Sequence, residues 1–175
     1  MFDLNVYTQL IADVDNATTT KEKGDSLEAL CEYLFDALKG VEVTERDVQL
    51  PAEEIDLVLW NAQLEDELRP LDPVILVECK NWSAAVGAAV LDNFIAKLRR
   101  RNLKTGMFIA ANGVTGNFHA SGERGARGVV GHALQEGIRV MTFTMDDLRA
   151  ITTVDDFKTL IKKRFCGIFV RKILN

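Results

Sequence analysis

The sequence has few of the residues that define small disulfide-bonded or zinc-binding proteins. It contains 3 cysteines, 2 histidines and 3 prolines among 175 residues. Cys31, Cys79 and Cys166 are odd in number, far apart, and without the short paired spacing of a zinc site, so we expect reduced and mostly buried thiols. His119 and His132 have no neighbouring cysteine or second histidine, and they support neither a zinc site nor a Cys–His nucleophile.

Long apolar runs are also missing. No stretch approaches the roughly 20 apolar residues that cross a bilayer, and the first residues lack the basic and then apolar pattern of a secretory signal. These absences favour a cytoplasmic protein without membrane contact. The length fits a single domain over residues 1–175, with a core at about 21–150 and a C-terminal helix and tail at 151–175.

A general excess of basic residues, common in proteins that bind nucleic acid, is absent as well. The net charge is −5, but its sign is divided along the chain. Residues 1–80 contain 6 basic and 19 acidic side chains, whereas residues 81–175 contain 15 basic and 7 acidic ones. The second part could attract phosphate, although an uneven solubilising charge would give the same pattern.

The spacing of apolar residues predicts a mixed α/β protein. Helical spacing of Leu27, Cys31, Leu34 and Leu38 indicates a first helix, and short runs rich in Val, Leu and Ile indicate strands. The predicted order is a helix at 21–38; strands at 41–49, 54–60 and 74–77; a helix after Ser83; a strand at 107–111; a helix at about 120–136; a strand at 138–143; short helices at 146–151 and 154–165; and an apolar tail at 167–174 that adds an edge strand.

Two carboxylates and a lysine lie within or directly after the predicted apolar strands. Alternation along the strand sends Glu78 and Lys80 to one face, while their neighbours Val77 and Cys79 point to the other. On the preceding strand Asp56 is alone in an apolar run, where an unpaired charge is costly to bury. Asp56 therefore needs a partner or a metal.

These residue types suit phosphodiester hydrolysis. A hard divalent cation such as Mg²⁺ is usually held by one or two carboxylates together with waters and substrate phosphate. Asp56 and Glu78 could supply the carboxylates, and Lys80 could stabilise charge at the phosphorus. A Glu-x-Lys triplet also arises by chance in chains of this length, and a plain salt bridge at a strand end is the structural alternative.

In this order the residues resemble the PD-(D/E)xK nuclease superfamily, most closely its Mrr-type restriction endonuclease branch. The resemblance runs from about Lys23 to Leu148. It depends on the segments 24–28, 54–58, 77–82 and 107–116. It implies a restriction-endonuclease-like αβββαβ core with a mixed central sheet flanked by helices, which is the order that the apolar pattern predicts.

The resemblance also implies roles for individual residues. Asp56 and Glu78 would be ligands of Mg²⁺ or Mn²⁺, Lys80 would position or activate the attacking water, and Glu28 would be the acid contributed by the first helix. Glu28 has a second interpretation, because Asp25 followed three residues later by Glu28 also forms a capping-box pattern. Ile55 replaces the proline that precedes the first aspartate in the family.

Further residues are candidates for contact with nucleic acid. Basic side chains on the exposed face of the helix after Ser83, opposite its apolar stripe, would suit phosphate, although a solvated helix face has the same pattern. A tryptophan beside the site would stack on a base or pack in the core. Two arginines lie in the glycine-rich segment 122–131, which could close on a DNA backbone. The residues in question are Lys97, Arg100, Arg101, Lys104, Trp82, Arg124 and Arg127.

The sequence thus predicts a Mg²⁺-dependent DNA endonuclease of the Mrr-like restriction or defence type. One alternative is a structure-selective repair nuclease resembling Holliday-junction resolvases. Another is a catalytically silent DNA-binding or assembly module, and a third is a nuclease that needs an activating or specificity-giving partner. Cutting both strands at once needs two active sites, so a homodimer fits this function.

Overall fold

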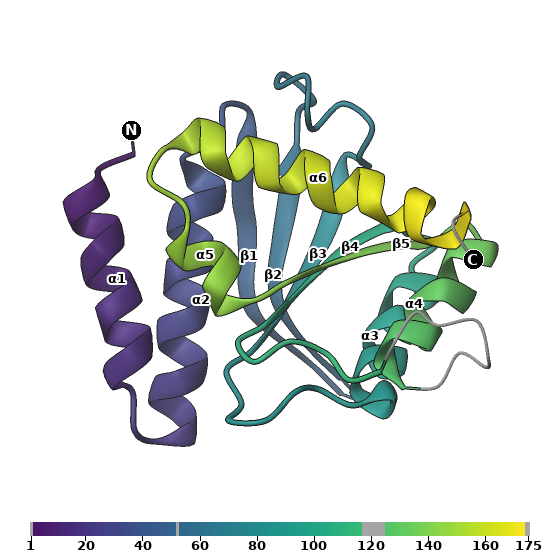
Figure 1. Cartoon of the computed structure of the whole chain (residues 1–175), viewed down its shortest axis with the longest axis horizontal. Coiled ribbons are helices and arrows are strands. Elements are labelled where there is room, and N and C mark those ends of the chain that lie inside the picture. Colours follow the sequence, from purple (N-terminus) through teal and green to yellow (C-terminus); the bar gives the residue numbers. More distant parts are fainter. Residues whose placement is uncertain (1, 52, 117–124, 174–175) are drawn as a thin grey trace.

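The computed structural model describes residues 2–51, 53–116 and 125–173 (Figure 1). Eleven helices and strands lie within these ranges. They are α1 (Leu4–Asn16), α2 (Thr20–Asp36), β1 (Val41–Leu50), β2 (Glu53–Asn61), β3 (Val74–Lys80), α3 (Ala88–Arg100), β4 (Thr105–Ala110), α4 (Ala126–Gln135), β5 (Arg139–Phe143), α5 (Met145–Arg149) and α6 (Val154–Ile173).

The strands form one sheet in the order β1-β2-β3-β4-β5. The first three strands pair antiparallel, and β3, β4 and β5 pair parallel. Helices cover both faces, with α2 and α6 on one side and α3 and α4 on the other (Figure 1). This mixed sheet between helical layers confirms the fold class expected from the sequence.

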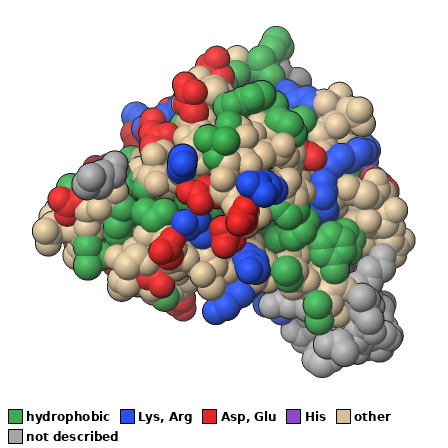
Figure 2. All heavy atoms as spheres, turned by 90° about the horizontal axis from the view of Figure 1, so that it is seen from above, with side chains coloured by type: hydrophobic (Ala, Val, Ile, Leu, Met, Phe, Trp, Pro, Cys, Tyr) green, Lys and Arg blue, Asp and Glu red, His purple; other side chains and the backbone are tan. Residues whose placement is uncertain are grey.

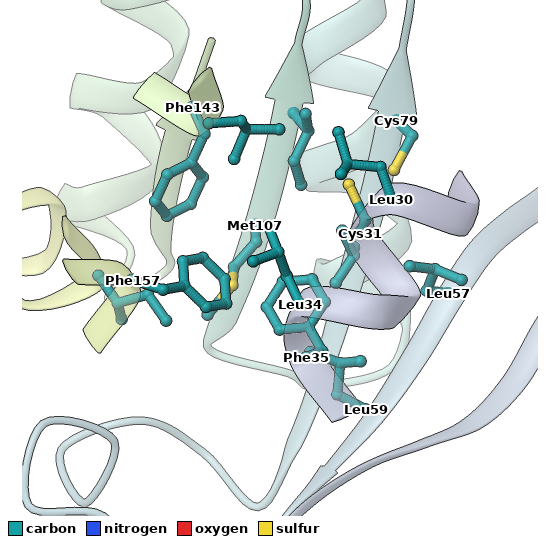
Figure 3. Packing of buried hydrophobic residues seen from close by; sticks show 14 of the residues in the cluster. Leu30, Cys31, Leu34, Phe35, Leu57, Leu59, Cys79, Met107, Phe143 and Phe157 are labelled. Carbon is teal, nitrogen blue, oxygen red and sulfur yellow. The ribbon is translucent and has the colours of Figure 1, made fainter. Parts of the chain in front are cut away.

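Strand alternation divides the core between the two faces. On β4, Met107 and Ile109 pack toward α2 and α6, whereas Phe108 packs toward α3. On β3, Cys79 packs in the cluster beneath α2, where Figure 3 shows it beside Cys31. Glu78, one residue earlier on the strand, therefore belongs to the α3 face.

A capping box of Asp25 and Glu28 would need Asp25 at the N-cap of α2, but the helix begins earlier, at Thr20. Its N-cap is Thr19, whose side chain accepts a hydrogen bond from the backbone of Glu22, while the Glu22 carboxylate binds the Thr19 backbone in return. Glu28 lies more than a turn further along the helix and is buried. The alternative interpretation, in which Asp25 and Glu28 cap this helix, is therefore wrong, and the role of Glu28 as a site residue stays a prediction.

Helix α1 was not predicted, although the sequence contains its signal. Apolar residues at helical spacing, Tyr7, Leu10, Ile11 and Val14, follow an N-cap at Asp3. Tyr7 is 2% exposed and its hydroxyl donates to the carbonyl of Leu148 at 2.7 Å. The core therefore includes residues that precede residue 21, where the sequence predicted the core to begin.

The predicted edge strand at 167–174 is wrong, because α6 continues through this segment to Ile173. Phe165 and Phe169, one helical turn apart, make a ring contact at 5.3 Å between centroids. Phe157 and Ile161 of the same helix are buried against the sheet. Although α6 is the longest helix, none among the described residues is long and apolar enough to span a membrane.

Candidate active site

The candidate site lies where β2 and β3 stop pairing. Leu57 and Val77 form the last pair of the antiparallel ladder, and Asp56 and Glu78 come just beyond it on the two strands. As whole residues, Asp56 and Glu78 are 4% and 6% exposed. Asp56 Oδ2 accepts a hydrogen bond of 2.7 Å from the backbone N–H of Cys79, which ties the first carboxylate to the strand that carries the second.

The ammonium of Lys80 joins the two carboxylates. Its Nζ atom lies 3.3 Å from Asp56 Oδ2 and 2.8 Å from Glu78 Oε1. Strand alternation places Glu78 and Lys80 on one side of β3, as the sequence indicated. The structure therefore brings Asp56, Glu78 and Lys80 together around one positive charge, while their catalytic roles stay predictions.

The pKa values of Asp56 and Lys80 follow from this arrangement. Burial raises the pKa of Asp56 above its usual range, and the nearby Glu78 carboxylate raises it further, against the opposing effect of Lys80. Burial lowers the pKa of Lys80, but Glu78 and Asp56 together outweigh it and the net pKa is raised. Lys80 is thus held firmly in its charged form.

A second lysine, Lys97 of α3, contacts the site from the opposite side of Glu78. Its Nζ atom lies 2.6 Å from Glu78 Oε2 and 2.5 Å from the carbonyl oxygen of Glu54. Lys97 is 9% exposed. The prediction that Lys97 belongs to an exposed basic helix face is wrong, because a four-carbon side chain reaches inward from the helix to a buried carboxylate. Each oxygen of Glu78 therefore binds a different lysine.

Glu28 faces the same region from α2. Its Oε2 atom is buried without a hydrogen-bond partner and lies 3.6 Å from the Arg46 guanidinium. Burial, the nearby Asp47 carboxyl group and the charge of Asp56 together raise the pKa of Glu28 to about 8, against the opposing effect of Arg46. Glu28 thus has an unsatisfied oxygen among acidic neighbours.

The raised pKa of Glu28 predicts a pH-dependent stability. Between its ordinary value of 4.5 and about 8 the folded state holds a proton that the unfolded state releases, so stability falls as pH rises through this range. Glu28→Gln removes the titration. With chelator present, we expect the Tm of the unchanged protein to fall by about 5 °C more than that of the variant between pH 5 and pH 8.

Glu32→Gln is the matched control for this measurement, because Glu32 lies on the same helix and binds the same arginine, Arg46, at 2.8 Å. Its profile should follow that of the unchanged protein. Parallel profiles for Glu28→Gln and the unchanged protein would show that the Glu28 proton is not linked to folding.

The other basic residues predicted to bind nucleic acid are dispersed. Arg100 and Arg101 both pair with Glu53 at the start of β2, and Lys104 follows α3 with an exposed side chain. Arg127 lines a separate hollow between α4, β5 and α6. Arg124, a candidate for DNA contact, lies outside the described residues, as does His119, and His132 is exposed on α4.

The linear division of charge does not persist in three dimensions. Basic residues of the second half pair with acidic residues of the first, as in Lys97–Glu78, Arg149–Asp15 and Lys158–Glu65. The face over α6 likewise shows basic and acidic side chains intermixed (Figure 2). Attraction of DNA would therefore depend on local cations near the site and not on a wholly basic half of the molecule.

A hollow of about 700 Å³ opens in front of the site. Asp56, Lys80 and Glu28 line it, together with the first turns of α2 and the residues that follow β3. Glu78 does not line it and lies behind Lys80. Trp82, predicted either to stack on a base or to pack in the core, is 46% exposed at the rim of this hollow. The core interpretation of Trp82 is therefore wrong.

The donor set fits a hard divalent cation that is held only partly by protein. Within the described ranges no three His, Cys, Asp or Glu side chains form a complete metal-binding group. Two carboxylates nevertheless converge on one cationic nitrogen, Lys80 Nζ, and Glu28, which lines the hollow together with Asp56, has a buried oxygen without a hydrogen-bond partner. Such a partial set is what Mg²⁺ uses when water and phosphate complete its coordination.

Comparison with known proteins gives one family. A family model described as a restriction endonuclease, of the Mrr catalytic type, matches residues 19–138. A search of curated proteins gives no match. Among solved structures, SfsA of Pyrococcus furiosus in complex with Ca²⁺ matches with 17% identity and a TM-score of 0.40, over 70% of this chain and 56% of that one. This chain thus spans little more than half the length of SfsA.

Proposed function

Because the chain belongs to the Mrr-type restriction endonuclease family, a branch of the PD-(D/E)xK nucleases, we propose that it is a metal-dependent endonuclease that hydrolyses phosphodiester bonds of DNA. One observation carries the proposal. Asp56 and Glu78, on different strands, converge on the ammonium of Lys80 beside a hollow that is open to solvent. A purely structural ion pair would need neither the second carboxylate nor the hollow.

Mg²⁺ or Mn²⁺ would be held by Asp56 and Glu78, and when bound would supply Lewis-acid activation of water and neutralisation of phosphate charge. Glu28 would support the same cation or hold a water molecule, through its unsatisfied Oε2. With a cation bound, the raised pKa of Asp56 would return toward its ordinary range, because a nearby positive charge favours the carboxylate.

The two lysines have different tasks in this proposal. Lys80 lines the hollow, so its ammonium can reach a phosphate oxygen and stabilise the charge that develops there. Lys97 lies on the other side of Glu78 and also binds the Glu54 carbonyl, so it fixes the orientation of the second carboxylate relative to β2. Lys97 is thus a positioning residue.

We infer restriction of foreign DNA, or defence more generally, as the biological setting. Its support is the family assignment, since restriction enzymes are DNA endonucleases. A structure-selective repair nuclease would use the same three residues, and the choice between the two depends on the substrate that is cut. The experiment that tests the function therefore compares substrates as well as metals.

Purified protein should be incubated at low salt with supercoiled plasmid, linear duplex and a four-way junction, with Mg²⁺, Mn²⁺ or chelator. We expect phosphodiester cleavage with either metal and none with chelator. Cleavage of plasmid and linear duplex supports the restriction-type function, whereas cleavage confined to the junction supports the repair nuclease. DNA binding without cleavage under either metal would overturn the nuclease proposal in favour of a silent binding module.

A further inference from the structure

A second, polar hollow of about 450 Å³ adjoins the candidate active site. It lies among α1, the start of α2, the ends of β3 and β4, and α5. Four of its lining residues also line the hollow in front of Asp56 and Lys80: Lys23, Asn81, Trp82 and Ser83. The two hollows are therefore adjacent, and the segment that follows β3 lines both.

This shared segment is held firmly by its backbone. Asn112 Nδ2 donates to the carbonyl of Trp82 at 2.6 Å, and Asn81 Nδ2 donates to the carbonyl of Lys23 at 3.2 Å. Further along, Val86 forms a parallel bridge with Val114. These contacts from β4 and α2 fix the direction in which the Trp82 side chain leaves the chain.

The ring of Trp82 is nevertheless exposed. It is 46% exposed, and across the described part of the chain its indole makes neither a hydrogen bond nor a ring contact. Single exposed aromatic side chains are common on protein surfaces, and Trp60 is exposed to the same degree; what distinguishes Trp82 is that it lines both hollows beside the candidate site. It is the arrangement of an aromatic platform on which a base can stack.

A basic residue, Lys23, shares the lining of both hollows with Trp82. Lys23 lines both hollows and is only partly exposed, yet its ammonium has no ion-pair partner within residues 2–51, 53–116 and 125–173. Its neighbour Lys21, by contrast, pairs with Asp25 at 2.6 Å. Lys23 is thus available to a phosphate group that enters either hollow.

We propose that the second hollow is a nucleotide subsite that holds one unpaired nucleotide of the DNA strand adjacent to the scissile phosphate. Trp82 stacks on its base, Lys23 binds its phosphate, and the polar wall formed by Ser83 and Asn112 faces the base edge. The volume suits a single nucleotide, since small-ligand pockets start at roughly 300 Å³. This inference depends on the proposed nuclease function and adds the structure of its substrate.

The nucleotide must be unpaired because stacking needs a free base face. In a duplex the faces of each base are covered by its neighbours, and a base reaches a pocket only when it is flipped, frayed or single-stranded. The subsite therefore predicts preference for DNA that carries an unpaired nucleotide beside the cleavage point over fully paired duplex.

Trp60 provides the control for a direct test. It is the only other tryptophan in the sequence, is 47% exposed, and lines neither hollow. In the Trp60→Phe protein, Trp82 is the sole indole fluorophore. With chelator present to prevent cleavage, we expect titration with a 12-nucleotide oligothymidylate to quench this fluorescence, whereas a blunt duplex of 12 base pairs leaves it unchanged.

Affinity should change in parallel. By fluorescence anisotropy of a labelled oligothymidylate, Trp82→Ala should weaken binding by about tenfold, Trp82→Phe should restore most of it, and Trp60→Ala should change nothing. In the cleavage assay, a duplex with one unpaired nucleotide should be cut faster than its fully paired counterpart, and Trp82→Ala should remove this difference.

The subsite would be overturned if the anisotropy showed binding while the Trp82 fluorescence stayed unquenched. Equal affinities for Trp82→Ala and the unchanged protein, or no binding of the oligothymidylate, would overturn it as well. Because binding is measured without metal, this failure is separate from failure of the nuclease proposal. Metal-dependent cleavage at the same rate in Trp82→Ala and the unchanged protein would support the nuclease function and reject the subsite. Fluorescence quenching by the oligothymidylate without cleavage of any DNA would support the subsite and reject the nuclease function.

Discussion

Replacing Lys80 with methionine should lower kcat for DNA cleavage by about 100- to 1,000-fold, the usual loss when one preorganised group that stabilises transition-state charge is removed. Methionine keeps much of the side-chain length and removes the charge. The buried Asp56 and Glu78 carboxylates, each in contact with the Lys80 ammonium, then lose that partner, so the assay must run well below the Tm of the variant. Single-turnover cleavage at saturating metal measures the effect.

Lys80→Arg separates charge from geometry in this experiment. Arginine keeps the positive charge but presents a planar fork in place of a compact ammonium, so we expect a partial loss that lies between the methionine variant and the unchanged protein. Lys80→Met with a kcat within about threefold of the unchanged protein would contradict the assignment of Lys80 to the transition state.

Replacing Lys97 with methionine should destabilise the fold by about 3 to 5 kcal/mol, because removal of one partner leaves a buried charge uncompensated. Glu78 Oε2 and the Glu54 carbonyl both lose their contact with the lysine. Thermal unfolding with chelator should show a fall in Tm of roughly 10 °C for a protein of this size. Cleavage should fall as well, through misplacement of Glu78.

A divalent cation should reverse part of this loss. We expect Mn²⁺ to bind the carboxylate that Lys97 has released, so the rise in Tm on adding Mn²⁺ should be larger for Lys97→Met than for the unchanged protein. Arg99→Met is the matched control, since Arg99 lies on the same helix and pairs with Glu136 at the surface, where a lost ion pair costs at most about 1 kcal/mol. Equal Tm values for the two variants would exclude the positioning role of Lys97.

The main features of the fold were predictable because they depend on local patterns. Apolar spacing indicated α2, the strands β1 to β5 and α3, and alternation along β3 assigned Glu78 and Lys80 to one face. The errors have local causes too. The periodic apolar residues of α1 were overlooked, and the apolar end of α6 was assigned to a strand because a short apolar run fits either structure.

The candidate site was predictable in part for a related reason. Asp56 is a lone acid in an apolar run, so its need for a partner is visible without coordinates. Lys97 gave no such sign, because a lysine that follows an apolar stripe on a helix looks solvated whether it points outward or reaches back to a buried carboxylate. The environment of Glu28, with its unsatisfied oxygen, likewise arises from Arg46 and Asp47 on a strand distant in sequence.

By itself the sequence determined the order of the elements from α2 to β5, the family, and the choice of Asp56, Glu78 and Lys80 as candidate site residues, since these depend on spacing and residue type. Only the tertiary structure decided which charges meet. It paired the basic second half with the acidic first half, directed Lys97 to Glu78, and placed the side chains of Lys23 and Trp82 between two hollows with no ion pair or hydrogen bond among the described residues. Such contacts join residues far apart in the chain, and their geometry is set by packing across the sheet, which no local pattern encodes.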